Sequence, residues 1–190
     1  MDILLGIFSA FGLSASAGLN AYIPLLVVAL LARFTNLITL SEPWDTLSSW
    51  WIIGLLVILS LIEFFADKFP AVNHVNDAIQ TFIRPAAGAI AFAASARVIT
   101  DVHPVLSLAA GLVVAGGVHA VKSVAVRPAV TVTTGGAGNI PVSILEDIIA
   151  TFMSILSIVL PVMMIALAIM ITALIFYAIA RRMSRERASA

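Results

Sequence analysis

Residues 3–34 are ILLGIFSAFGLSASAGLNAYIPLLVVALLARF, and no charged residue occurs in this stretch before Arg33. A helix that spans a membrane needs about 20 mainly apolar residues, so the stretch is longer than one span. Small polar residues interrupt it at 14–20, and Pro24 interrupts it again. Because serine, glycine and proline weaken a helix interior, we predict a broken helix or a short helical hairpin.

The composition of the whole chain extends this interpretation. Of the 190 residues, 62% are hydrophobic and 11% are charged, and the mean hydropathy is +1.13. Soluble domains are usually about 45–50% apolar and about 25% charged, so a soluble fold of this size could not bury so much apolar surface. We therefore predict an all-α, polytopic helical membrane protein with broken or re-entrant helices and the lipid bilayer as a partner.

The charge balance and the missing residue types exclude several classes of function. The formal net charge is zero, so the chain lacks the basic field that binds nucleic acid. Cysteine is absent, which excludes disulfides, thiolate metal sites and cysteine nucleophiles. Histidine and carboxylate residues supply metal-ligand types, but no HExxH or comparable spacing occurs. We expect neither a metal nor another cofactor, and no residue is assigned a catalytic role.

Further helical segments follow the first stretch. We predict a span at about residues 50–65, a short amphipathic helix at 71–83, a short span at 85–99 and another span at 105–126. Arg84-Pro85 and Arg127-Pro128 are expected to open helices, because proline suits the first helical turn.

Two segments of the C-terminal part are less regular. Residues 131–141 are too small and polar for a lipid-facing helix, and non-helical backbone at membrane depth must be covered by protein or water. Residues 141–180 are apolar apart from Glu146, Asp147 and Pro161, and one straight helix of this length would measure about 60 Å. That is twice the thickness of the hydrocarbon core. The segment therefore either kinks at Pro161 or forms two spans, and we expect five to seven membrane segments in all.

Positive charge gathers at the C-terminus. Four of the ten Lys and Arg residues lie there, namely Arg181, Arg182, Arg185 and Arg187. Because such residues stay on the cytoplasmic side of a last span, we predict one transmembrane domain over residues 1–182 and a basic cytoplasmic tail over 183–190. The first residues lack the basic region of a signal peptide, so the first apolar stretch is expected to stay in the mature protein.

Two short patterns recur along the chain. IRPAA at residues 83–87 is similar to VRPAV at 126–130, and GLNAYIP at 18–24 is similar to GNIP at 138–141. Paired segments broken by glycine and proline are typical of transporters built from inverted repeats. The order of the patterns differs between the two halves, so an inverted repeat and a chance match are both kept as alternatives.

Several ionisable residues fall inside apolar segments, where a charge is costly and each is a candidate for function. They are Glu63, Asp67, Arg84, His119, Lys122 and Arg127. The first two are four apart and share a helix face, and His119 and Lys122 share another. Carboxylates, an imidazole and fixed cations together suit the proton-coupled movement of a polar or anionic solute. The alternative is structural ion pairing without a solute.

The glycine-rich stretch supplies a second group of candidates. Gly135 and Gly136 could present backbone N–H groups to an anion, with Asn139 as the N-cap of the next helix. Glu146 and Asp147 follow in the early turns of that helix, where the helix dipole favours acidic side chains. This dipole effect is an equally good explanation of the two carboxylates.

Short motifs give the chain a recognisable pattern. They are AGLNAYIPLL at residues 17–26, EFFADKFP at 63–70, RPAAGA at 84–89, TGG at 134–136, NIP at 139–141 and ED at 146–147, with Asp77, Lys122 and Arg127. By these motifs the chain resembles bacterial membrane proteins of the domain-of-unknown-function family 4126. The resemblance covers most of residues 10–150, and it implies a membrane location without an activity. FIRPAAG at 82–88 is also similar to re-entrant segments of proteins that flip polyprenyl lipid carriers, although their flanking motifs are missing.

Together these observations favour a small transporter or lipid flippase in a bacterial inner membrane, with its C-terminus in the cytoplasm. A small anionic or lipid-linked solute would bind where Asn20 and the two broken segments meet the ionisable residues. Glu63 or Asp67 would carry the coupled proton, and the protein is expected to form a homo-oligomer. A membrane-embedded enzyme acting on a lipid headgroup and a non-catalytic scaffold are the alternatives.

Overall fold

The computed structural model describes residues 2–68, 70–99 and 103–161, and seven single positions beyond them. In these residues all regular elements are helical, which confirms the all-α prediction. The elements are α1 (Asp2–Leu19), α2 (Tyr22–Phe34), the 3₁₀ helix η1 (Trp44–Ser48), α3 (Trp50–Ala66), α4 (Pro70–Ile99), α5 (Pro104–Val121), the π-helical turn η2 (Lys122–Val126), α6 (Arg127–Thr134) and α7 (Asn139–Val159).

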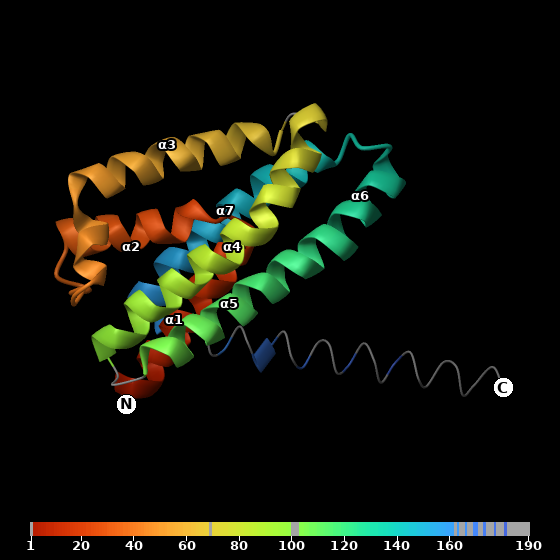
Figure 1. Cartoon of the computed structure of the whole chain (residues 1–190). Coiled ribbons are helices and arrows are strands. Elements are labelled where there is room, and N and C mark those ends of the chain that lie inside the picture. The colour runs from red at the N-terminus through yellow and green to blue at the C-terminus, as the bar shows by residue number, and fades with distance from the viewer. Residues whose placement is uncertain are drawn as a thin grey trace.

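Helix α1 lies at the centre of the molecule. It packs against α4, α5 and α7, while α2 lies between α3 and α7 (Figure 1). The apolar core follows from this arrangement, because Leu13 and Ala17 of α1 meet Leu25 of α2, Ile53 of α3 and Ala87 of α4. The core is built largely from small side chains, which lets the helices approach closely.

The predicted interruption of the first apolar stretch is confirmed at Asn20, while α1 continues through the serines at 14 and 16 and α2 continues through Pro24. Helix α1 ends at Leu19 and α2 begins at Tyr22, so the break lies at Asn20 and Ala21. In Figure 1, α2 turns back toward the end of the molecule where α1 begins, as in a helical hairpin. With 13 residues, α2 is about 20 Å long, shorter than the roughly 30 Å of a bilayer core.

The prediction that Arg-Pro pairs open helices is wrong for Arg84-Pro85, whereas Arg127-Pro128 lies in the first turn of α6, which continues the helix from η2. Helix α4 continues through Pro85, and α5, η2 and α6 follow one another without a break from Pro104 to Thr134 (Figure 1). Proline has no backbone N–H, so one carbonyl of the preceding turn loses its donor. Inside a bundle, groups of neighbouring helices can bind that carbonyl instead. Next to Pro85, α5 carries Gly116, which leaves room for the proline ring. Before Pro128 the π-helical turn widens the helix: the Arg127 N–H donates a hydrogen bond to the Lys122 carbonyl, five residues earlier.

The expected irregular stretch at residues 131–141 is much shorter than predicted. The chain stays helical to Thr134, and only residues 135–138 form a turn between α6 and α7. Threonine hydroxyls support the end of α6, because Thr134 Oγ1 donates to the Val130 carbonyl at 2.7 Å. Gly135 and Gly136 have φ of 63° and 90°, which a residue with a side chain rarely adopts.

Helix α7 ends at Val159 with Leu160 as its C-cap, so the regular helix is interrupted next to Pro161. Whether the following residues form a second span lies outside the described residues. The basic tail at 183–190 also lies outside them, as do Arg182, Arg185 and Arg187.

Large apolar side chains are exposed on this molecule, and charged side chains are buried inside it. Trp51 is 90% exposed and Phe82 is 80% exposed, whereas the Arg84 side chain, two residues further along α4, is fully buried. Two described helices, Pro104–Thr134 and Asn139–Val159, are long and apolar enough to cross a membrane. A soluble monomer rarely exposes such extensive apolar surface, so this distribution indicates insertion into a membrane.

The contact between α4 and α5 depends on glycine. A methyl group at Gly111 would lie 2.6 Å from the Cβ of Phe92 and 2.7 Å from the Cα of Ala89. We expect Gly111→Ala to destabilise the protein by about 1–3 kcal/mol, because the helices must separate. Gly117→Ala in the same helix is the matched control, since nothing lies within 4 Å of a methyl group there. Thermal unfolding in detergent compares them, and equal melting temperatures would contradict this packing.

Candidate functional site

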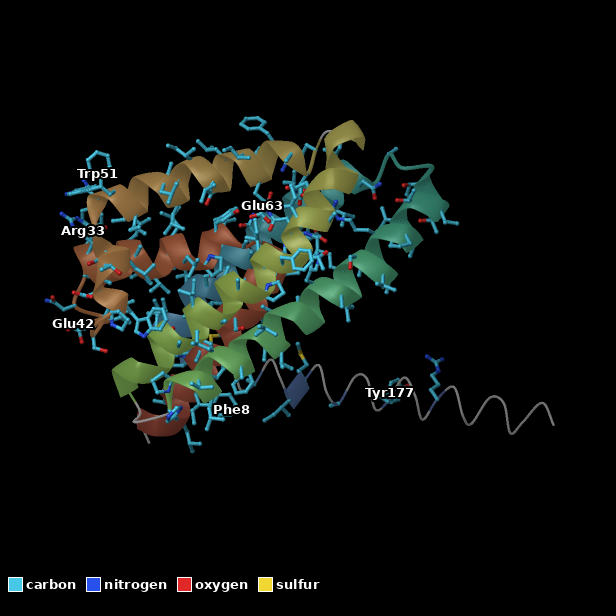
Figure 2. The ribbon with its side chains drawn as sticks, viewed as in Figure 1. Phe8, Arg33, Glu42, Trp51, Glu63 and Tyr177 are labelled. Atoms are coloured by element: carbon cyan, nitrogen blue, oxygen red, sulfur yellow. The ribbon has the colours of Figure 1, made fainter. Side chains whose placement is uncertain are left out.

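The ionisable side chains from distant parts of the sequence form one buried network. Its members are Glu63, Asp67 and Lys68 at the end of α3, Arg84 on α4, Lys122 in η2, Arg127 on α6, and Glu146 and Asp147 on α7. Figure 2 shows Glu63 on the inner side of α3, facing the other helices. Residues up to 79 apart in the chain therefore meet through charged groups, and the helices do not depend on apolar contacts alone.

Arg84 is the most deeply buried member of this network. Its Nη2 lies 2.9 Å from Glu63 Oε1 and 3.5 Å from Asp67 Oδ2, and its side chain is fully buried. The Arg84 Nε also donates to Glu63 Oε1, at 3.2 Å. Such a forked contact holds the two helices α3 and α4 in a fixed register.

His119 binds Arg84 on the side away from the carboxylates. Arg84 Nη1 lies 3.2 Å from His119 Nδ1, and Thr81 Oγ1 lies 3.2 Å from His119 Nε2. A guanidinium can only donate, so Nδ1 must accept. His119 is then the neutral tautomer that carries its proton on Nε2 and donates it to Thr81.

Asp67 is surrounded by cations. Its Oδ2 lies 2.9 Å from Arg127 Nη2, 3.5 Å from Arg84 Nη2 and 3.7 Å from Lys122 Nζ. Its Oδ1 accepts a hydrogen bond of 2.7 Å from Asn76 Nδ2. Three cationic side chains from three segments thus face a single carboxylate oxygen.

The π-helical turn brings Lys122 and Arg127 to the same face. In an α-helix, residues five apart lie about 140° apart around the axis. In η2 the Arg127 N–H bonds the carbonyl of Lys122, five residues earlier, so the two residues lie almost above one another. Both side chains consequently reach Glu146 Oε2, Lys122 at 2.8 Å and Arg127 at 3.4 Å.

Two charges of the network bind the broken ends of the first helical stretch. Where a helix stops inside a protein, its last carbonyls and first N–H groups need partners. Lys122 Nζ donates to the Leu19 carbonyl at the end of α1, at 3.0 Å. The Ala21 N–H at the start of α2 donates to Glu63, 3.1 Å from Oε2. A cation at a helix C-terminus and an anion at a helix N-terminus both match the helix dipoles.

Asn20 connects this break to α7. Its Oδ1 accepts from the N–H groups of Tyr22 and Ile23, each at 3.1 Å, so it caps α2. Its Nδ2 donates to Asp147 Oδ1 at 3.0 Å, and Asp147 Oδ2 lies 3.2 Å from Lys68 Nζ. Lys68 and Asp147 are the most exposed members of the network, at 13% and 12% of their side chains.

The structure brings nine of the twelve predicted site residues together. They are Asn20, Glu63, Asp67, Arg84, His119, Lys122, Arg127, Glu146 and Asp147. The other three lie at the turn between α6 and α7, where Gly135 is exposed and Gly136 and Asn139 are half-buried. None of these three contacts a charged side chain of the network in the described residues, because α7 carries Glu146 about 10 Å further along its axis. Asn139 reaches Arg127 only through Thr131, whose Oγ1 donates to the Arg127 carbonyl.

Two expectations about α7 are wrong. Asn139 is the first residue of the helix rather than its N-cap, a position that Gly138 occupies, and its Nδ2 donates to Thr131 Oγ1 instead. No acidic residue lies in the first turn, so the dipole effect does not explain Glu146 and Asp147. Their ion pairs with Lys122, Arg127 and Lys68 do.

Sequence reasoning missed Asn76 and Lys68. Asn76 belongs to the polar side of the segment predicted as an amphipathic helix, and this polarity was the available signal. Lys68 lies beside Asp147, with 13% of its side chain exposed. The side chains of His74 and Asp77 lie outside the described residues. In the described part of the chain, no three His, Asp or Glu side chains are grouped as metal ligands.

Comparison with known proteins identifies the family but no relative of known activity. Nothing among the curated proteins or the solved structures matches the chain. Residues 7–181 match the model of one family, described as a domain of unknown function. The match covers nearly the whole length, including the helix break and every charged member of the network, and the chain therefore belongs to the DUF4126 family.

Proposed function

We propose that this protein is a small membrane transporter that moves an anionic solute, or the anionic headgroup of a lipid, together with a proton. The observation that carries the proposal is the break between α1 and α2. Its two ends bind the titratable side chains of Lys122 and Glu63. Transporters place broken helices with charged partners at their binding sites, because an unwound backbone can release one partner and accept another.

Charge balance supports the coupling to a proton. The network contains four carboxylates and four cationic groups in the described residues: Glu63, Asp67, Glu146 and Asp147 against Lys68, Arg84, Lys122 and Arg127. An additional anion would leave one uncompensated negative charge in apolar surroundings, which is costly. Protonation of Glu63 or Asp67 removes that charge and leaves the cations free to bind the anion.

The transport cycle follows from these contacts. Protonated Glu63 no longer attracts Arg84, so the guanidinium can turn to the solute together with Lys122 and Arg127. Release of the proton on the other side of the membrane restores the ion pair and expels the anion. In this proposal α1 and α2 form a re-entrant hairpin whose junction moves between the two states.

The proposal includes a location. It places the protein in a bacterial inner membrane, as a multi-pass homo-oligomer with the C-terminus in the cytoplasm. The apolar helices and the basic residues near Arg181 support this orientation.

Complete pairing favours a second candidate function. Each charged member of the network has an oppositely charged partner, as a scaffold that only needs stability would require. In a scaffold the charges hold the helices in register and no solute enters. The two candidates differ in whether removing one titratable proton site abolishes a flux.

The test uses purified protein in liposomes that contain a pH-sensitive dye. Inorganic phosphate or succinate is added outside at constant ionic strength, and fluorescent phosphatidylglycerol reports lipid movement. We expect anion-dependent proton entry with the wild type and a loss of about tenfold or more with Glu63→Gln, which cannot carry the proton. Asp45→Asn, an exposed carboxylate outside the network, should behave as wild type. Equal measurable fluxes in wild type and Glu63→Gln would remove the coupling role of Glu63, and absence of any anion-dependent flux in the wild type would favour the scaffold.

A further inference from the structure

We propose that the Asp67 carboxylate is an internal substitute for a phosphate-type oxyanion, which displaces it from a site made by Arg84, Lys122 and Arg127. This inference rests on the proposed function and specifies the ligand class of the same site. It concerns binding, so it is testable without measuring transport.

The contacts of Asp67 are those of a bound anion. Arg127, Arg84 and Lys122 all direct nitrogen atoms at Oδ2, within 2.9–3.7 Å. Asn76 donates to the other oxygen, Oδ1, at 2.7 Å. The three cations come from α4, η2 and α6, so they surround the carboxylate instead of forming a single side-by-side pair.

The cations around Asp67 outnumber its single negative charge. A carboxylate offers two oxygens in one plane, and three cationic groups, which also bind Glu63 and Glu146, converge on Oδ2 alone. A phosphate group offers more oxygens in a tetrahedral arrangement and up to two charges. Arginine and lysine together are the usual partners of such groups. The site therefore fits a phosphate monoester or inorganic phosphate better than it fits Asp67.

Asp67 is the carboxylate best placed to leave. It lies at the C-cap of α3, where the helix ends. Glu63 lies inside α3 and binds the Ala21 N–H, and Glu146 lies in the middle of α7. Glu63 and Glu146 are held within helices, whereas Asp67 lies where α3 ends.

The burial of the network indicates the direction of entry. Side-chain exposure rises from 0% at Arg84 to 8% at Arg127 and 13% at Lys68. An anion would approach from the side of Lys68 and Arg127, the more exposed cations of the network. Attraction by Lys68 favours this route.

The test measures phosphate binding by thermal unfolding of the full chain in detergent. Asp67→Asn keeps the size of the side chain and removes the competing charge, so we expect phosphate to bind it roughly tenfold more tightly than the wild type. The stabilisation should be absent in chloride of equal ionic strength. It should also be lost in Asp67→Asn/Arg127→Gln, while Asp45→Asn should match the wild type.

Two further measurements make the result decisive. If Asp67→Asn does not fold, the wild type is titrated with phosphate against chloride: a phosphate-specific rise in Tm supports the inference, and no rise overturns it.

Nanodiscs with phosphatidic acid or phosphatidylcholine distinguish the source of the phosphate group. Stabilisation by phosphatidic acid alone identifies a lipid headgroup, and stabilisation by inorganic phosphate identifies a free solute. Absence of both overturns the inference, whereas Glu63-dependent proton flux with succinate would leave the proposed function intact.

Discussion

Replacing Arg84 by methionine should destabilise the folded protein by about 3–5 kcal/mol, because removing one member of a buried ion pair leaves its partner uncompensated. Glu63 would lose the guanidinium at 2.9 Å, and Asp67 would lose one of its three cations. His119 would lose the donor at its Nδ1. Fluorescence-detected gel filtration after heating in detergent measures the change in Tm.

Arg33→Met is the matched control for this variant. Arg33 is exposed, where its guanidinium donates to the Ser48 carbonyl and stacks 4.2 Å from the centre of the Trp50 ring. Its loss should cost no more than about 1 kcal/mol. Glu63→Met/Arg84→Met should recover part of the stability, since it removes both charges. If Arg84→Met melts no earlier than Arg33→Met, the ion pair does not hold α3 and α4 together.

Deleting Val113 should abolish the folded protein. The deletion turns the rest of the helix by about 100° relative to its first part. Gly111 and Ala115, which both pack against Gly88 of α4, would no longer share a face. Val113 itself is 70% exposed, so the deletion removes no buried side chain. The expected result is a loss of monodisperse protein in gel filtration.

Deleting Val124 is a control of equal size inside the π-helical turn. Without this residue, which is 77% exposed, Lys122 and Arg127 would be four apart and about 40° apart in an ordinary α-helix. Both would still face Asp67. The deletion is made with Pro128→Ala, because proline in an ordinary α-helix clashes with the preceding turn. We therefore expect this deletion to leave more folded protein than the deletion of Val113. Equal losses for the two deletions would contradict the interpretation that η2 holds one extra residue.

The helix break at Asn20 and the span from Trp50 to Ala66 could be predicted because their signals are local. A run of apolar residues and a cluster of small polar ones are visible within a few positions of the chain. The convergence of Glu63, Asp67, Lys122 and Arg127 was also predictable in outline. A charge inside an apolar segment must face the protein interior, and there it needs partners.

The Arg-Pro pairs show where local signals were insufficient. Proline usually marks a helix start, yet α4 continues through Pro85 beside Gly116. Likewise, the glycines at 135 and 136 looked like part of a binding site but form a turn at the end of the bundle. At Pro85 the outcome depends on what α5 offers at that depth, which the local pattern does not contain.

Hydrophobic runs and their interruptions are properties of adjacent residues, so the amino-acid order alone established an all-α chain with buried charges. Which charged side chains form ion pairs depends on the rotation and register of the helices, so only the tertiary structure could decide it. Lys122 finds the Leu19 carbonyl across 103 residues, and Arg127 reaches Asp67 only after a π-helical turn has changed its direction. Because a rotation of one residue moves a side chain by about 100°, no count of charges could have selected these partners.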